Sequence, residues 1–194
     1  MTWFRAGLIT VGVILLLTTL WQTPSAAGQF QWSGVRHEAG LRLVYGKNTQ
    51  EADVRVVGIL PRFGWVLVRP GSTWLAGFGV SFVLEGIFTA VQAEKNGVEL
   101  GLTPLLRLTY PWGRQVLLFV EGGAGVIGEF FDSPAVPHTF NFTPQVGGGL
   151  EVALARNLGL VLAYRFRHSS NAGLYEDNPA FDVHLFQAGI SYYF

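Results

Sequence analysis

Apolar and polar residues alternate along most of the chain beyond residue 27. In the last segment, Phe186, Ile190 and Phe194 share one parity, while Gln187 and Ser191 share the other. Successive side chains of a β-strand point to opposite faces of the sheet, so such a segment has one apolar face and one small or polar face. The alternation predicts eight strands, at about 36–46, 53–68, 74–89, 97–110, 116–130, 144–156, 159–170 and 183–194.

Charged residues recur on the polar faces of these segments. They are Arg42, Glu85, Glu99, Arg107, Glu121, Glu151 and Arg165. Many of the segments are longer than the roughly ten residues that a tilted strand needs to cross a bilayer. Apolar outer faces and a polar, glycine-rich interior predict an all-β fold, an eight-stranded antiparallel transmembrane β-barrel over residues 28–194. The alternative is a soluble eight-stranded barrel of the lipocalin type, which would turn its apolar face inward.

Short and long connections alternate between the predicted strands. Short ones fall at 69–73, 112–115 and 156–158, and longer ones lie near 46–52, 90–96, 131–143 and 171–182. Outer-membrane barrels combine short periplasmic turns with longer external loops. The pattern therefore predicts that both ends of the barrel segment are periplasmic and that the seventh strand ends at the external rim.

The first 27 residues form a separate segment. Arg5 precedes an uncharged, mostly apolar run at 6–21, and small residues follow at 25–27. A basic start, an apolar centre and a small-residue end predict a secretory signal peptide over residues 1–27. A short membrane anchor is the alternative, although the run is short for a spanning helix.

The composition limits the kinds of chemistry and partners that are expected for the protein. The 194 residues include no cysteine, so neither disulfides nor thiolate chemistry is expected. Thirteen basic and thirteen acidic residues balance, which gives no general attraction to nucleic acid. The histidines lack the spacing of a metal site, so no cofactor or metal is expected; they are His37, His138, His168 and His184.

Candidate chemistry lies at the end of the seventh predicted strand. The lipid-facing parity of Leu160 and Tyr164 continues to His168 and Ser170, whereas Ser169 falls on the interior face. Side chains at i and i+2 are neighbours on one face, about 7 Å apart along the strand, so a small twist brings an imidazole within reach of a hydroxyl. Such a pair combines a base with a nucleophile. A solvated polar strand end without chemistry is the alternative.

A third group must orient the imidazole. Asp182 lies at the start of the last predicted strand, beside the seventh, and has the lipid-facing parity. It is therefore the predicted acid ahead of Glu176 in the preceding loop. Asn171, the backbone at 172–173 and Asn178 could donate hydrogen bonds to an oxyanion.

This stretch resembles the lipid A 3-O-deacylase family (PagL type). The shared pattern is His-x-Ser-Asn-Ala-Gly at 168–173, followed by Asn178 and by an acid at Asp182. The resemblance implies an eight-stranded outer-membrane barrel with a Ser-His-acid triad on its outer surface, near the external leaflet. It also implies the reaction, which is cleavage of the ester-linked acyl chain at the 3-position of lipid A.

The resemblance further implies a role for each matching residue. Ser170 would be the nucleophile, His168 the base and Asp182 the orienting acid. The residues that would support the oxyanion or the loop are Asn171, Gly173 and Asn178. The family usually has Glu at the acid position, so the shorter Asp182 requires a closer backbone and keeps Glu176 open as a substitute. The chain also has Pro179 where the family tends to have Gly.

The predicted function is therefore an outer-membrane ester hydrolase of lipid A in lipopolysaccharide. The alternative is a non-catalytic eight-stranded barrel that serves adhesion or envelope stability. A diffusion pore is disfavoured because side chains fill an eight-stranded interior. The aromatic end at Phe194 resembles the signal that the barrel assembly machinery recognises, and a homodimer stays open.

Overall fold

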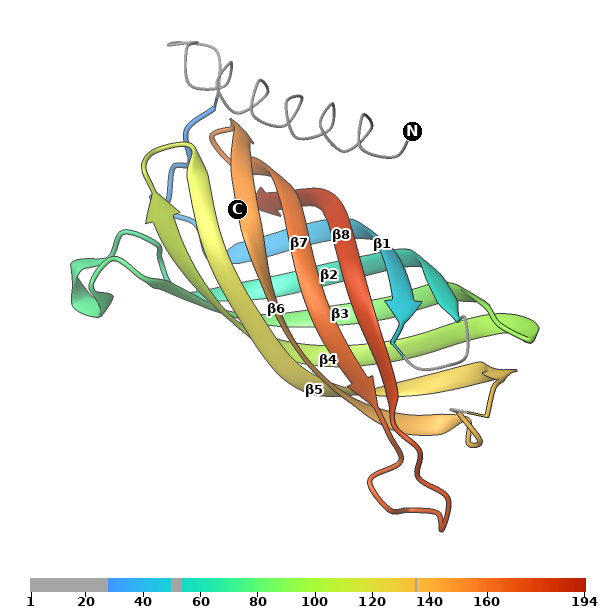
Figure 1. The fold of residues 1–194 in the computed structure, drawn as a ribbon. Helices are drawn as coiled ribbons and strands as arrows, with labels where there is room; N and C mark the ends of the chain where they lie inside the picture. The colour runs from blue at the N-terminus through green and yellow to red at the C-terminus, as the bar shows by residue number, and fades with distance from the viewer. Residues whose placement is uncertain (1–27, 50–53, 135) are drawn as a thin grey trace, which may run out of the picture.

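The computed structural model describes residues 28–49, 54–134 and 136–194. The predicted signal peptide at 1–27 lies outside these residues. Eight strands follow one another into a closed antiparallel barrel in which β8 pairs with β1 (Figure 1). They are β1 (His37–Asn48), β2 (Arg55–Val68), β3 (Gly79–Gln92), β4 (Lys95–Trp112), β5 (Val116–Asp132), β6 (Phe140–Ala155), β7 (Leu158–Ser169) and β8 (Phe181–Tyr193). The predicted eight-stranded barrel is confirmed. Among the described residues, no helix is long and apolar enough to span a membrane.

The two ends of the barrel differ. At one end, here called the terminal rim, β1 begins and β8 ends. The opposite end, here called the loop rim, carries the connections 49–54, 93–94, 133–139 and 170–180. The connection near 90–96 was predicted to be long, but β3 and β4 stay paired as far as Val91 and Gly97. Only two residues then separate the strands, so that prediction was wrong.

The facing predicted from the alternation is confirmed. Phe186, Ile190 and Phe194 are 57%, 47% and 49% exposed, whereas Gln187 and Ser191 are buried inside the barrel. The other strands repeat this arrangement, with large apolar side chains outside and charged or small ones inside. An apolar exterior of this kind suits lipid rather than water.

Two strands begin four or more residues from the predicted position. β3 starts at Gly79 and not at residue 74, because a 3-10 turn at Thr73–Leu75 and the left-handed Ala76 and Gly77 interrupt the extended backbone. β6 starts at Phe140, four residues early, since Phe140 and Gly128 pair across β5 and β6. This earlier start matters for the site because it brings β6 alongside the end of β7.

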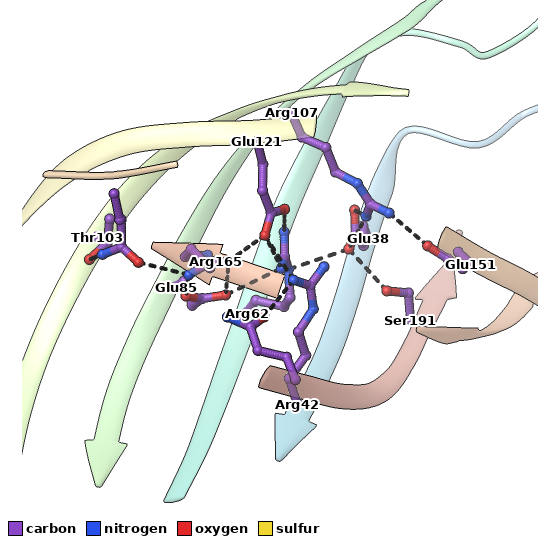
Figure 2. A network of polar contacts seen from close by, with 12 residues as sticks. Glu38, Arg42, Arg62, Glu85, Thr103, Arg107, Glu121, Glu151, Arg165 and Ser191 are labelled. Atoms are coloured by element: carbon purple, nitrogen blue, oxygen red, sulfur yellow. Dashed lines mark hydrogen bonds and ion pairs between the residues drawn. The ribbon is translucent and has the colours of Figure 1, made fainter. Parts of the chain in front are cut away.

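An ion-pair network fills the middle of the barrel and the half toward the terminal rim. Figure 2 shows its contacts from close by. Its arginine and glutamate side chains are almost completely buried. The pairs include Arg42–Glu121, Arg62–Glu85, Arg62–Glu121, Arg107–Glu38, Arg107–Glu151, Arg165–Glu85 and Arg165–Glu121. Arg107, for example, reaches Glu38 at 3.0 Å and Glu151 at 2.8 Å. Pairing offsets much of the cost of removing these charges from water.

The half toward the loop rim is more apolar than predicted, although the buried Arg167–Glu99 pair also lies there. An apolar cluster packs there, and it includes Val44, Val56, Ile87, Val91, Ile127, Phe131, Phe181 and Val183. Ile87, for example, is buried inside the barrel. Inward-facing apolar residues blur a hydrophobic alternation, so the sequence pattern did not reveal this cluster.

Candidate active site

His168 and Asp182 meet on the outer surface at the loop rim. The two residues are direct partners in the β7–β8 ladder, so their side chains leave the sheet on the same face. His168 Nδ1 lies 2.7 Å from Asp182 Oδ1, and their side chains are 35% and 28% exposed. A carboxylate only accepts hydrogen bonds, so Nδ1 donates the hydrogen and Nε2 is left to accept a proton.

Ser170 follows the end of β7 and stays attached to β6 by one isolated bridge. Its N–H donates to Phe142 O at 3.1 Å, and Phe142 N–H donates to Ser170 O at 2.8 Å. Residues directly opposite in an antiparallel pair project to the same face. Because Phe142 is exposed on the outer surface, Ser170 projects outward as well, on the face of His168.

Ser169 projects to the other side, as predicted. It is 1% exposed, and its Oγ donates to Glu129 Oε2 at 3.0 Å inside the barrel. Ser170, in contrast, is half-buried at the outer surface. Of the two adjacent serines, only Ser170 shares a surface with the imidazole.

The loop after Ser170 is organised by two asparagines. The Asn171 side chain is buried; it donates to Asp177 O at 2.7 Å and accepts from Gly173 N–H at 2.9 Å. Asn178 Oδ1 accepts from Asn171 N–H at 2.8 Å. Ala172 has φ of 55°, a strained left-handed conformation for a residue with a Cβ, and Gly173 has φ of 81°. These bonds fold residues 171–178 into a compact loop beside Ser170.

Two other candidates lie apart from the His168–Asp182 pair. Glu176 is exposed in the loop, and the His168 hydrogen bond goes to Asp182. His184 lies two residues after Asp182 on the same face, but its Nδ1 pairs with the Tyr164 hydroxyl and its ring stacks on the Tyr164 ring. The imidazole of His184 is therefore bound to Tyr164, on the side away from Asp182.

An apolar groove runs on the outer surface farther down β8. Its floor is at Ala188, and its walls include Leu43, Leu162 and Phe186. Ala188 is the ladder partner of Leu43 on one side and of Leu162 on the other, so one small side chain lies between two large ones. The groove thus lies on β8, the strand that carries Asp182 near its start.

Several contacts inside the barrel, on the interior side of this surface, were not predicted from the sequence. Glu129 accepts from Ser169 and Asn141, and Arg167 donates to Glu99 at 2.6 and 3.0 Å. The interior parity of these positions was visible in the sequence, but the contacts depend on how strands β4 to β7 are registered. Among the described residues, no group of three His, Asp or Glu side chains could hold a metal ion.

Comparison with known families shows which family the chain belongs to. The family described as lipid A 3-O-deacylase (PagL) matches residues 58–191, which is more than half of the chain. The chain belongs to the lipid A 3-O-deacylase family. It is therefore an outer-membrane ester hydrolase that removes the 3-O-linked acyl chain of lipid A.

Solved structures similar to this deacylase are outer-membrane barrels. The crystal structure of the outer membrane enzyme PagL has a TM-score of 0.58 at 18% identity. The match covers 79% of this chain and 99% of the PagL chain. Neisserial surface protein A (NspA) has a TM-score of 0.53 at 12% identity, with 83% and 97% covered. The N-terminal β-barrel domain of Pseudomonas aeruginosa OprF has a TM-score of 0.50 at 10% identity, with 82% and 99% covered. At these identities the likeness supports the fold. No curated protein sequence matches the chain.

Proposed function

We propose that this lipid A 3-O-deacylase cuts its ester with Ser170 as nucleophile, His168 as general base and Asp182 as the acid that orients the imidazole. The observation that carries the proposal is the 2.7 Å hydrogen bond between His168 and Asp182 on the outward face that Ser170 shares. A base held in one tautomer beside a hydroxyl is the arrangement that activates a serine.

The proposed reaction has two stages. In the first, His168 Nε2 takes the Ser170 hydroxyl proton while Oγ attacks the ester carbonyl carbon. The imidazolium then gives that proton to the departing 3-oxygen of the sugar, which leaves an acyl-serine. In the second stage His168 takes a proton from water and the resulting hydroxide attacks the acyl carbon. The imidazolium then gives the proton to Ser170 Oγ as the acyl–oxygen bond breaks, which releases the fatty acid and restores Ser170.

The loop residues have supporting roles in this proposal. The negative oxygen of each tetrahedral intermediate needs hydrogen-bond donors close to Ser170. Asn178 uses Oδ1 for Asn171, so its Nδ2 is the side-chain donor that we assign to the oxyanion. Asn171 and Gly173 shape the loop, because both side-chain ends of Asn171 already bond to the loop backbone.

The position of the three residues suits a membrane lipid. A site on the outer barrel wall meets an acyl ester within the leaflet, so the substrate need not be extracted. The groove at Ala188 lies about 20 Å along β8 from Asp182, six residues at the rise of a strand, and is proposed to receive the far end of the acyl chain. All three residues come from one chain, so the reaction requires no second copy.

Export and orientation complete the proposal. Residues 1–27 act as a signal peptide, the loop rim faces outward, and the active site lies at the external leaflet. The aromatic face of β8 that ends with Phe194 is proposed as the part that the barrel assembly machinery recognises.

Mass spectrometry of lipid A tests the proposed function. Cells that express the wild type should contain lipid A lighter by one 3-O-linked acyl group, and cells that express Ser170→Ala should not. Both proteins must be present at equal levels in the outer membrane. Unchanged lipid A with well-folded wild type would favour the alternative, a non-catalytic barrel.

A further inference from the structure

The two residues on either side of His168 in β7 both bind buried carboxylates inside the barrel. Arg167 and Ser169 flank His168 on β7 and point into the barrel, where each is 1% exposed. Arg167 binds Glu99 with two nitrogens, and Ser169 Oγ donates to Glu129 Oε2 at 3.0 Å. The strand that presents His168 outward is thus attached from the inside on either side of that residue.

Glu129 also reaches β6. Asn141 Nδ2 donates to the same oxygen, Glu129 Oε2, at 2.6 Å. Asn141 and Ser169 directly precede Phe142 and Ser170, the two residues whose backbones form the isolated bridge beyond the end of β7. One carboxylate oxygen therefore joins the two strands directly behind the bridge that supports Ser170.

The burial of Glu129 calls for an explanation beyond stability. It is 2% exposed, and its second oxygen, Oε1, has no hydrogen-bond partner among the described residues. Glu99, its direct partner across β4 and β5, is also acidic. The charge of Glu99 is paired with Arg167, so the main cost is desolvation, and a buried carboxylate with one unsatisfied oxygen is expensive for that reason.

Hydrogen bonds also connect Glu129 and Asn141 to the loop before β6, at residues 133–139. Asn141 Nδ2 also donates to His138 O at 2.9 Å, and Glu129 N–H donates to Thr139 O at 2.7 Å. The His138 ring stacks on Tyr175, with centroids 3.9 Å apart. Tyr175 belongs to the loop that follows Ser170, so both sides of the candidate site connect to Glu129.

We propose that Glu129 is a positioning residue for deacylation. From inside the barrel, it fixes the ends of β6 and β7 so that Ser170 is held against the His168–Asp182 pair on the outside. The inference rests on the proposed roles of those three residues. It predicts that Glu129 acts on turnover rather than on substrate binding.

Glu129→Leu is the central variant, with Glu129→Gln as its conservative partner. Leu removes the acceptor, and kcat should fall between about tenfold and a hundredfold at nearly constant KM, because small misplacement of reacting groups is costly. Gln keeps an acceptor oxygen, although a neutral one, so kcat should stay within about threefold of wild type. Ser191→Ala is the matched control: it removes an interior hydroxyl donor to a buried glutamate, Glu38, at the opposite rim of the barrel, and kcat should not change.

A second variant tests the same proposal in case Glu129→Leu does not fold. Asn141→Ala combined with Ser169→Ala removes both donors and keeps the carboxylate, and it should reproduce the loss in kcat. Labelling of Ser170 by a fluorophosphonate should slow in parallel, while the heat-modifiable mobility of the barrel on gels stays normal.

Wild-type kcat in a folded Glu129→Leu or double variant would overturn the proposal, and so would an equal loss in Ser191→Ala. Either result leaves the proposed function standing, because wild type still releases fatty acid. If wild type itself releases none, the proposed function fails instead.

Discussion

At the scale of single residues, the alternation of a strand decides which serine can act. Ser169 and Ser170 are adjacent, yet one donates to Glu129 inside the barrel and the other shares the outer surface with His168. Ser170→Ala should lower deacylation by at least about a thousandfold, while Ser169→Ala keeps most of it, since Asn141 still holds Glu129. The measurement is release of fatty acid from lipid A by purified, refolded protein. Equal loss from both substitutions would contradict the assignment by facing.

The acid can be tested in the same way. Asp182→Asn should leave the barrel folded, because the residue lies at the surface of the rim, but it should reduce kcat by about three orders of magnitude or more, since an amide permits the wrong imidazole tautomer. Asp182→Glu should retain substantial activity, because it restores the acid that the family usually has. Glu176→Gln serves as the exposed control and should change little. If Glu176→Gln were inactive while Asp182→Asn kept wild-type activity, Glu176 and not Asp182 would be the acid.

At the scale of strands, β8 joins the candidate catalytic pair to the groove at Ala188. Ala188→Phe should fill the groove and lower kcat/KM about tenfold for long-chain substrates, as a change in pocket volume typically does. A short-chain ester should be cleaved at the wild-type rate. Ala124→Phe is the matched control, because Ala124 is an exposed alanine on the outer face of β5. Equal losses for long and short chains would place the acyl chain elsewhere.

The strands also show why sequence predicted some features and missed others. A period of two is local, so it correctly predicted that Phe186 faces out, that Gln187 faces in, and that His168 and Ser170 share a side. The contact of Glu129 with Asn141 and Ser169 joins three strands, and it depends on registers that one strand's sequence does not contain. The early start of β6 was missed for the same reason, since residues 140–143 become a strand by pairing with the end of β5.

At the scale of the whole molecule, side chains fill the barrel from end to end. Paired arginine and glutamate side chains occupy the middle and the half toward the terminal rim (Figure 2). In the half toward the loop rim, the apolar cluster around Val56, Ile87 and Phe181 packs beside buried polar contacts such as Arg167–Glu99. Phe30 and Trp32 add an aromatic group with Tyr193 at the terminal rim. The barrel is consequently a rigid, filled support whose chemistry lies on its outer wall.

A filled barrel should not conduct ions. Water and salt would have to cross both the buried ion pairs and the apolar layer, and eight strands leave no space beyond their own side chains. Purified protein in a planar lipid bilayer should therefore show no steady single-channel steps at 1 M salt, where a porin in the same bilayer gives clear ones. Replacing Phe181 and Phe131 by Ala would open the apolar layer but leave the ion pairs in place, so conductance should still be absent. Regular steps from the wild type would mean that the interior rearranges in lipid, and the assignment of all function to the outer wall would then fail.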